Sequence, residues 1–103
     1  MKLYVAGPMS NLPELNFPAF HAAAATLRNR GHEVSNPAEV NPDPGMKWED
    51  AMRADIPELL KCEAIVLLPG WEKSRGARLE RHIAVEMGMK VMPLEFALVW
   101  SGA

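Results

Sequence analysis

The sequence predicts an α/β fold: a small Rossmann-like three-layer domain with a parallel sheet of four to five strands. Strand-like apolar runs alternate with helix-like segments along the chain, which is the pattern of a parallel sheet covered on both faces. Residues 64–68 are apolar at every position, as a strand buried on both faces requires. With 103 residues, 49% of them hydrophobic and 23% charged, we expect one domain over residues 1–103.

The first strand and the first helix are predicted from short local signals. Lys2–Ala6 is a mostly apolar run that a Gly-Pro pair ends. Residues 14–30 have a helical period, with Asn16 as a candidate N-cap, Pro18 in the first turn and Gly31 after the last. The apolar stripe of this helix comprises Phe17, Phe20, Ala24 and Leu27.

The middle of the chain predicts a strand, an irregular segment and a second helix. Residues 32–35 form a brief strand. Residues 36–45 contain four prolines or glycines, so they are predicted to be an ordered loop or a mobile lid. Residues 47–62 are helical in pattern, although Pro57 should kink or restart the helix.

The last third predicts two core strands around a helix. Residues 64–68 form the first strand and residues 69–73 a loop. Residues 74–87 form a helix that Gly88 ends, and residues 89–94 form the last strand, while residues 95–100 have no clear assignment. The expected apolar stripe of this helix comprises Leu79, Ile83 and Met87.

Charge and composition exclude several classes of function. Eleven Lys and Arg against thirteen Asp and Glu give a net charge of -2, so a nucleic acid polymer is not expected as partner. The single cysteine, Cys62, excludes an intramolecular disulfide, and the scattered His21, His32 and His82 lack metal-ligand spacing. No apolar run could span a membrane and no signal peptide opens the chain, so we expect a cytoplasmic protein.

The loop after the first strand is the first candidate for ligand binding. It reads Gly7, Pro8, Met9 and Ser10, and parallel sheets bind ligands beyond the carboxyl ends of their strands. Gly7 would let the backbone approach a ligand and Ser10 offers a hydroxyl, although a plain turn with a capping serine explains the same residues. The loop has neither the G-x-G-x-x-G nor the Walker pattern, so no nucleotide cofactor is expected.

The start of the helix at residues 74–87 is a second candidate. Ser74 would cap the helix, and a capped helix N-terminus is suited to bind an anion. Glu80 lies about a turn and a half further on, near the crevice of the sheet. The alternative is an exposed glutamate on a face rich in ion pairs, with Arg75, Arg78, Arg81 and Glu86 as neighbours.

Further candidates lie on the first strand and on the helix at residues 47–62. Asp55 could face Glu80 as a second carboxylate, or simply cap the turn that Pro57 restarts. Two carboxyl groups in one pocket push their pKa values apart, which suits glycosidic chemistry. Tyr4 could reach a carboxylate or be a core aromatic, and Trp48 and Met52 could line a slot for a base or pack in the core.

These motifs together resemble the nucleoside 2-deoxyribosyltransferase-like superfamily. Residues 4–10 resemble its opening strand and loop, and Asp55 precedes an apolar strand as the family's helical aspartate does. Residues 76–80, followed by Ala84 and Gly88, resemble the family's Gly-x-x-x-Glu-x-x-x-Ala helix. The resemblance covers residues 2–92 and implies that Glu80 is the catalytic nucleophile.

One position separates branches of that superfamily. The base-exchanging transferases tend to carry an aspartate six residues before the nucleophile, whereas the 5′-monophosphate N-glycosidases carry a phosphate-binding serine. Ser74 occupies that position here, so the resemblance favours a deoxynucleoside 5′-monophosphate hydrolase. The short Gly-Pro-Met-Ser form is also similar to a branch common in bacteria and their phages.

The resulting hypothesis is a metal-free and cofactor-free glycosidase acting on a nucleotide or nucleoside. Glu80 would form a glycosyl-enzyme, with Asp55 assisting departure of the base and Tyr4 holding Glu80. The expected substrate-binding residues are Gly7, Pro8, Met9, Ser10, Trp48, Met52, Ser74 and Gly76. Base exchange and a non-catalytic nucleotide-binding module remain alternatives.

Self-association is expected from apolar residues near the end of the chain. Trp71, Phe96, Val99 and Trp100 lie in loop or terminal segments, and a homodimer or larger oligomer would cover them. The resemblance also implies that a neighbouring subunit's C-terminus often closes the site, although residues 96–103 show no recognisable counterpart.

Overall fold

Four parallel strands form the sheet in the part of the chain that the computed structural model describes, residues 1–100. The strands are β1 (Lys2–Ala6), β2 (Glu33–Ser35), β3 (Ala64–Leu67) and β4 (Lys90–Pro93). Their order across the sheet is β2-β1-β3-β4, and Tyr4 in the middle of β1 pairs with Ser35 on one side and Ile65 on the other. The predicted parallel sheet of four to five strands is therefore confirmed.

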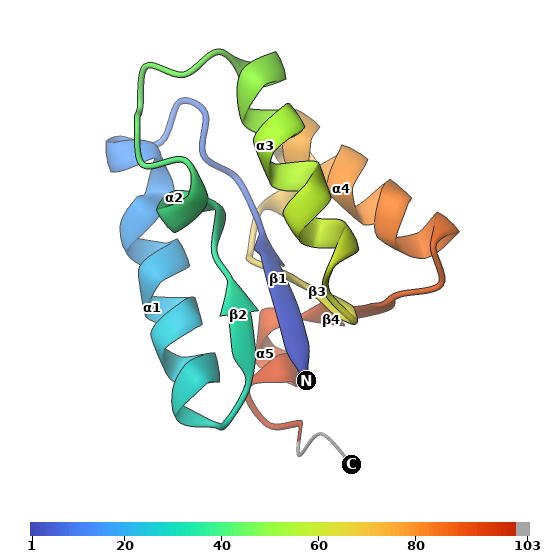
Figure 1. Ribbon diagram of the computed structural model, residues 1–103. Helices are drawn as coiled ribbons and strands as arrows, with labels where there is room; N and C mark the ends of the chain where they lie inside the picture. Colours follow the sequence, from blue (N-terminus) through green and yellow to red (C-terminus); the bar gives the residue numbers. More distant parts are fainter. Residues whose placement is uncertain (101–103) are drawn as a thin grey trace.

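The helices cover this sheet on both faces (Figure 1). They are α1 (Phe17–Asn29), α2 (Pro37–Val40), α3 (Trp48–Leu60), α4 (Arg75–Glu86) and α5 (Leu94–Ala97), with short 3₁₀ segments η1 (Pro13–Asn16) and η2 (Trp71–Lys73). Alternate strand residues point to opposite faces, and each face has its own apolar core. Leu3 and Val5 pack with α1, α2 and α5, whereas Tyr4 and Ala6 pack with α3 and α4. This arrangement confirms the three-layer prediction.

The order of the strands creates a crevice at one edge of the sheet. From β1 the chain runs through α1 to β2 on one side, and later through α3 to β3 on the other. Ligands of such sheets bind where these two directions part, beyond the carboxyl ends of the strands. Gly7 lies at this point, where a Cβ atom would approach the Leu68 Cβ to 2.7 Å. The glycine is thus required for packing against Leu68, a reason that differs from the expected approach to a ligand.

The first helix begins later than predicted. Residues 13–16 form η1, in which Glu14, Leu15 and Asn16 have left-handed φ angles of 53°, 53° and 60°. Asn16 does not cap α1 through its side chain; its Nδ2 donates to the Pro8 carbonyl at 3.0 Å. The prediction failed here because helical periodicity cannot register a reversal of backbone handedness.

The segment predicted as a loop or mobile lid contains helix α2. Asn36 caps this helix, because its Oδ1 accepts from the Ala38 N–H at 3.0 Å, and Pro37 occupies the first position. The pattern of Asn followed by Pro is a typical helix start, which the four Pro and Gly residues of the stretch obscured. Residues 41–47 then connect α2 to α3.

Pro57 does not restart the helix in which it lies. Helix α3 continues from Trp48 to Leu60 with Pro57 inside it. Proline removes one backbone donor and clashes with the preceding turn, but packing of α3 on the sheet and on α4 compensates for this. Asp55 therefore lies inside a helix, and its interpretation as an N-cap is wrong.

The buried face of α4 also differs from the predicted stripe. Ala77, Glu80 and Ala84 are buried, whereas Leu79 and Ile83 are half-buried and Met87 is 63% exposed. Sequence periodicity assigned the larger apolar residues to the core, but close packing against α3 and the sheet selects small side chains there. It also brings one carboxyl group inside the protein.

The terminal residues that have no clear assignment in the sequence include α5, after which residues 98–100 follow. Phe96 and Val99 are 49% and 74% exposed, while Trp71 and Trp100 are half-buried. Self-association stays a prediction, which light scattering would test. The last three residues of the tail lie outside the described part of the chain.

Candidate active site

A cleft of about 510 Å³ lies beyond the carboxyl ends of the strands, and residues of η1, α1, α2, α3 and α4 contribute to its lining. This volume is in the range of small-ligand sites. The loop after β1, the connection between α2 and α3, and the start of α4 contribute residues to its walls. Among the residues that line it are all eight predicted to bind substrate and both predicted carboxylates: Gly7, Pro8, Met9, Ser10, Trp48, Met52, Asp55, Ser74, Gly76 and Glu80.

Glu80 is buried beside the hydroxyl of Tyr4. Glu80 is 5% exposed, and the Tyr4 hydroxyl donates a short hydrogen bond to its Oε2. Tyr4 itself is fully buried in β1, between β2 and β3, so it holds the carboxyl group against a rigid strand. The alternative of an exposed glutamate in a network of ion pairs is therefore wrong, and the expected Tyr4–Glu80 hydrogen bond is present.

Burial dominates the acidity of this group. It raises the pKa of Glu80 to about 8, with a further rise from the nearby Asp55 carboxyl, while the Tyr4 hydrogen bond acts in the opposite direction. Burial and the Glu80 charge also raise the pKa of Tyr4 well above its ordinary value, so its hydroxyl stays protonated and donates. The contact supplied to Glu80 is thus a neutral hydrogen bond.

Asp55 is the second carboxyl group of the cleft. It projects from α3, is 7% exposed, and burial raises its pKa to about 6. Its partner is Asn41, whose Nδ2 donates to Oδ1 at 2.5 Å and opposes part of that rise. Sequence reasoning missed Asn41, because a contact across fourteen residues and an irregular connection has no periodic signal.

The start of α4 offers hydrogen-bond donors and positive charge to the cleft. The Ser74 Oγ accepts from the Ala77 N–H at 3.1 Å, which leaves the hydroxyl proton available to donate. The first N–H groups of a helix have no acceptor within it, and here they are those of Arg75 and Gly76. Lys73 and Arg75 add two cationic side chains to the cleft wall. This cluster has the chemistry of an anion-binding site.

Trp48 and Met52 line the cleft and also pack between α3 and α4. A Cβ atom at Gly76 would lie 3.3 Å from the Met52 sulfur and 3.4 Å from the Trp48 indole nitrogen, so the glycine permits this close contact. The Arg75 guanidinium stacks over the Trp48 ring at 3.6 Å. One face of the indole is therefore occupied, and only the rest of the ring is accessible for a base.

The remaining candidates do not converge on the cleft. Cys62 is buried, and its sulfur contacts the Glu58 carbonyl at 3.3 Å. The ring of His32 stacks on that of Trp100, with centroids 5.8 Å apart. Within residues 1–100, no group of three or more His, Cys, Asp or Glu side chains is placed to hold a metal ion. None of the described helices has the length and apolar character of a membrane span.

The fold of this chain is similar to the folds of two solved structures, a 2-deoxyribosyltransferase and a CMP N-glycosidase. A 2-deoxyribosyltransferase from Bacillus psychrosaccharolyticus superimposes with a TM-score of 0.69 and 22% identity, over 90% of this chain and 71% of the other. The Clostridium botulinum CMP N-glycosidase BcmB gives a TM-score of 0.62 and 18% identity, over 90% and 67%. At these identities the likeness establishes the shared fold.

The chain belongs to the family described as "Domain of unknown function (DUF4406)", whose model matches residues 1–93. The match includes every strand of the described sheet and all the residues that line the cleft. No curated protein matches the sequence.

Proposed function

We propose that this protein cleaves the N-glycosidic bond of a deoxynucleoside 5′-monophosphate and releases the free base, with Glu80 as nucleophile. One observation carries the proposal: a carboxyl group is buried in the cleft wall with a phenol, and not a cation, as its hydrogen-bond partner. Such burial opposes folding, because a carboxylate loses its hydration without gaining an ion pair. Strongly perturbed acids in a cleft are typical of catalytic sites.

The shared fold supports this chemistry. Both solved structures described above are named as enzymes that act at the bond between a base and a sugar, one by transfer and one as an N-glycosidase. The cleft of this chain lies where such α/β sheets bind ligands, and it combines two carboxyl groups with an anion-binding helix start.

In the reactive state of the first step the shared proton is on Asp55, and an oxygen of the ionised Glu80 carboxylate attacks C1′ of the sugar as the bond from C1′ to the base nitrogen breaks. The electron pair of that bond goes to the base, and Asp55 delivers a proton to it directly or through water. The product is a glycosyl ester of Glu80. Tyr4 fixes the orientation of the carboxyl group through its hydrogen bond to Oε2.

In the second step water attacks C1′ and the ester bond to Glu80 breaks, so the carboxylate is regenerated. Asp55, now ionised, takes the proton from that water, which restores the starting state. Retention at C1′ is expected, since two inversions occur in sequence. A free base in place of water would give base exchange instead.

The 5′-phosphate is expected to bind at the start of α4. The Ser74 hydroxyl and the N–H groups of Arg75 and Gly76 offer donors, and the positive end of the helix attracts a dianion. Ser10 and the backbone around Gly7 line the same cleft. A phosphorylated substrate is therefore expected to react faster than its nucleoside.

A chromatographic assay tests the proposal. Each deoxynucleoside 5′-monophosphate, the matching ribonucleotide and the nucleoside are incubated with the protein, and free base is quantified. Glu80→Ala is the test variant and Glu86→Gln is the matched control, because Glu86 is an exposed glutamate on the same helix and outside the cleft. We expect base release by the wild type and Glu86→Gln, and none by Glu80→Ala.

The other outcomes separate the alternatives. Transfer of the sugar to an added free base would favour the deoxyribosyltransferase activity over hydrolysis. Release from unphosphorylated nucleosides alone would remove the phosphate-binding role of Ser74. Turnover by Glu80→Ala would overturn the mechanism. Absence of turnover, together with calorimetric binding of the same nucleotides, would favour a nucleotide-binding module.

A further inference from the structure

The amide of Asn41 links the end of α2 to the buried acid of α3. Its Nδ2 donates to the Asp55 Oδ1 at 2.5 Å and lies 3.4 Å from the Ala51 carbonyl oxygen. Ala51 and Asp55 are one helical turn apart, so both acceptors lie on the same face of α3. A single nitrogen therefore contacts the carboxyl group and the backbone of the helix that carries it.

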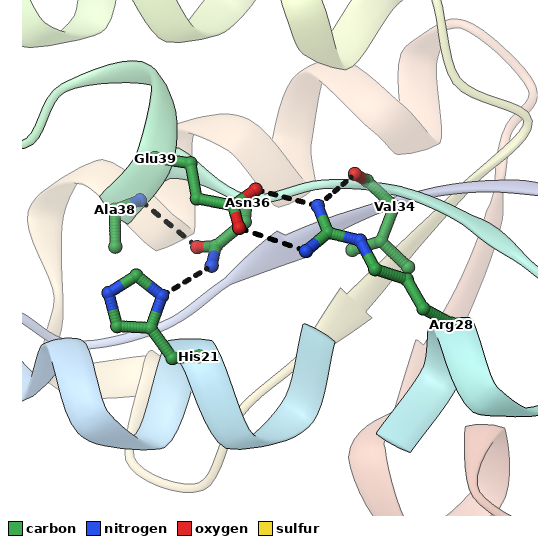
Figure 2. A network of polar contacts seen from close by, with 6 residues as sticks. All are labelled: His21, Arg28, Val34, Asn36, Ala38 and Glu39. Carbon is green, nitrogen blue, oxygen red and sulfur yellow. Dashed lines mark hydrogen bonds and ion pairs between the residues drawn. The ribbon is translucent and has the colours of Figure 1, made fainter. Parts of the chain in front are cut away.

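The local structure before Asn41 holds this amide in place. The Asn41 N–H donates to the Pro37 carbonyl at 2.8 Å, which fixes the residue to the end of α2. Asn36 caps the start of α2, and its Nδ2 lies 3.2 Å from the His21 Nδ1 (Figure 2). The Arg28 guanidinium donates to Glu39 in α2 at 2.6 and 2.9 Å. Helix α2 is thus fastened to α1, and Asn41 is presented from a fixed support.

Asn41 constrains the carboxyl group in a specific way. An amide N–H can only donate, so Oδ1 must accept from it whenever this contact is present. In a neutral carboxylic acid the carbonyl oxygen is the better acceptor, and the acid proton then resides on the other oxygen. We propose that Asn41 is a positioning residue for Asp55, which fixes its side chain and directs the acid proton to Oδ2.

The inference rests on the proposed function only where it treats Asp55 as the general acid. The charged groups around the same cleft are Glu80 and Arg75 from α4, Lys73 before it and Asp43 from the connection after α2. Tyr4 of β1 is the other titratable group nearby. Among the described residues, Asn41 is the side chain that donates a hydrogen bond directly to Asp55. Removing the Asn41 amide should therefore favour the protonated form of Asp55.

Carbon-13 NMR titration of the Asp55 carboxyl group, assigned with Asp55→Asn, tests the inference without substrate. In Asn41→Leu we expect the pKa of Asp55 to rise by roughly one unit. Asn41→Asp keeps the shape of the side chain and places a like charge beside Asp55, so it should raise that pKa as well. Glu39→Gln is the control, because it loosens α2 without removing the amide, and there we expect no shift. An unchanged Asp55 pKa in both Asn41 variants would overturn the inference.

Activity gives a second and independent readout. If Asn41 directs the proton, Asn41→Leu should move the acidic limb of the kcat/KM profile upward with the NMR value and reduce kcat more than it raises KM. If the Asp55 pKa shifts in the Asn41 variants but the protein hydrolyses no nucleotide, the role of Asn41 is supported and the proposed reaction is contradicted. If the protein is active but both Asn41 variants leave the Asp55 pKa and the pH profile unchanged, the proposed reaction is supported and the role of Asn41 is contradicted.

Discussion

Two polar clusters on opposite faces of the sheet shift the pKa values of their carboxyl groups in opposite directions. On the side of α1 and α2, Arg28 donates two hydrogen bonds to Glu39, and this lowers the pKa of Glu39 (Figure 2). On the side of α3 and α4, Glu80 has a phenol as its hydrogen-bond partner, and burial raises its pKa to about 8. Folding is helped by the first arrangement and opposed by the second.

The difference between the two clusters supports a role beyond stability for the cluster around Glu80. The Arg28–Glu39 pair is half-exposed, joins α1 to α2 and has its charges matched, so packing alone explains it. An apolar residue at position 80 would satisfy the same face of α4 better, since its neighbours Ala77 and Ala84 are buried. A carboxyl group that weakens the fold is expected to serve another purpose, and under the proposed function that purpose is catalysis.

Paired substitutions, Glu80→Gln and Glu39→Gln, should give the largest effect and opposite results. Glu80→Gln should lower kcat/KM by roughly 10³-fold or more. It should also raise the free energy of unfolding by on the order of 4 kcal/mol at pH 8, because the pKa of Glu80 is raised from 4.5 to about 8. Glu39→Gln should leave activity unchanged and lose about 0.5 kcal/mol or less, because both side chains of its ion pair face solvent. Urea denaturation at several pH values measures the second quantity.

The pH dependence of these stability changes has a defined sign. The folded-state pKa of Glu80 is raised from 4.5 to about 8, so folding favours the protonated form, and stability falls as pH rises through that interval. The gain from Glu80→Gln should therefore be absent below about pH 4 and largest above pH 8. For Glu39 the pKa is lowered, so its contribution is present above the ordinary value and lost as pH falls. A loss of stability in Glu80→Gln at high pH would contradict the comparison.

The second prediction concerns the pH profile of the reaction. The proposed mechanism needs one proton shared by Asp55 and Glu80, whose pKa values are raised to about 6 and about 8. We expect a bell-shaped profile of kcat/KM with limbs near these two values, each belonging to the pair and not to one residue. Activity should fall about tenfold for each pH unit beyond either limb. A flat profile between pH 5 and 9 would contradict shared protonation.

The regular parts of both regions could be predicted from the sequence. The apolar run of β3 and the glycines after α1 and α4 carry local signals, and every residue predicted to bind substrate lines one cleft. Local hydrophobic periodicity, together with the rule that parallel sheets bind ligands beyond the carboxyl ends of their strands, is enough to predict these features. For Glu80 the sequence left two positions open, one near the crevice and one exposed among ion pairs, and the structure shows that the residue is buried.

What the sequence did not predict depends on tertiary contacts. Helix α2 was hidden by its prolines, and the contact of Asn41 with Asp55 joins segments with no common period. The small residues Ala77 and Ala84 of α4 are fully buried whereas its larger apolar residues are only half-buried or exposed, since close packing against α3 decides the face. The left-handed residues of η1 likewise have no pattern that a helical period could show.

The third prediction concerns the polar cluster on the side of α1 and α2. Asn36 is 1% exposed, caps α2 through Oδ1 and contacts His21 through Nδ2. Asn36→Ala should lower the free energy of unfolding by about 1 to 2 kcal/mol, because it removes a cap and a buried hydrogen bond. Asn36→Asp keeps the capping acceptor, so its loss should be smaller at neutral pH. Equal losses in the two variants would show that the cap contributes nothing.

The smallest effect is expected at the turn that joins the two regions, η1, between the cleft loop after β1 and helix α1. Glu14 is exposed and has a φ of 53°, a conformation that strains any residue with a Cβ atom. Glycine removes this strain but makes the unfolded chain more flexible, so Glu14→Gly should raise stability by only about 0.5 kcal/mol. Asn16→Gly is the contrasting variant, because it relieves a φ of 60° and also loses the hydrogen bond to the Pro8 carbonyl.

The Glu14→Gly variant also tests whether the left-handed turn η1 helps to position the cleft loop. If the left-handed turn only connects elements, Glu14→Gly should gain stability and keep full activity. If the turn holds the cleft loop in place, the same variant should raise KM while the fold becomes more stable. Thermal unfolding and substrate titration on the same samples separate these results, and a Glu14→Gly protein less stable than the wild type would show that the backbone at this position is not strained.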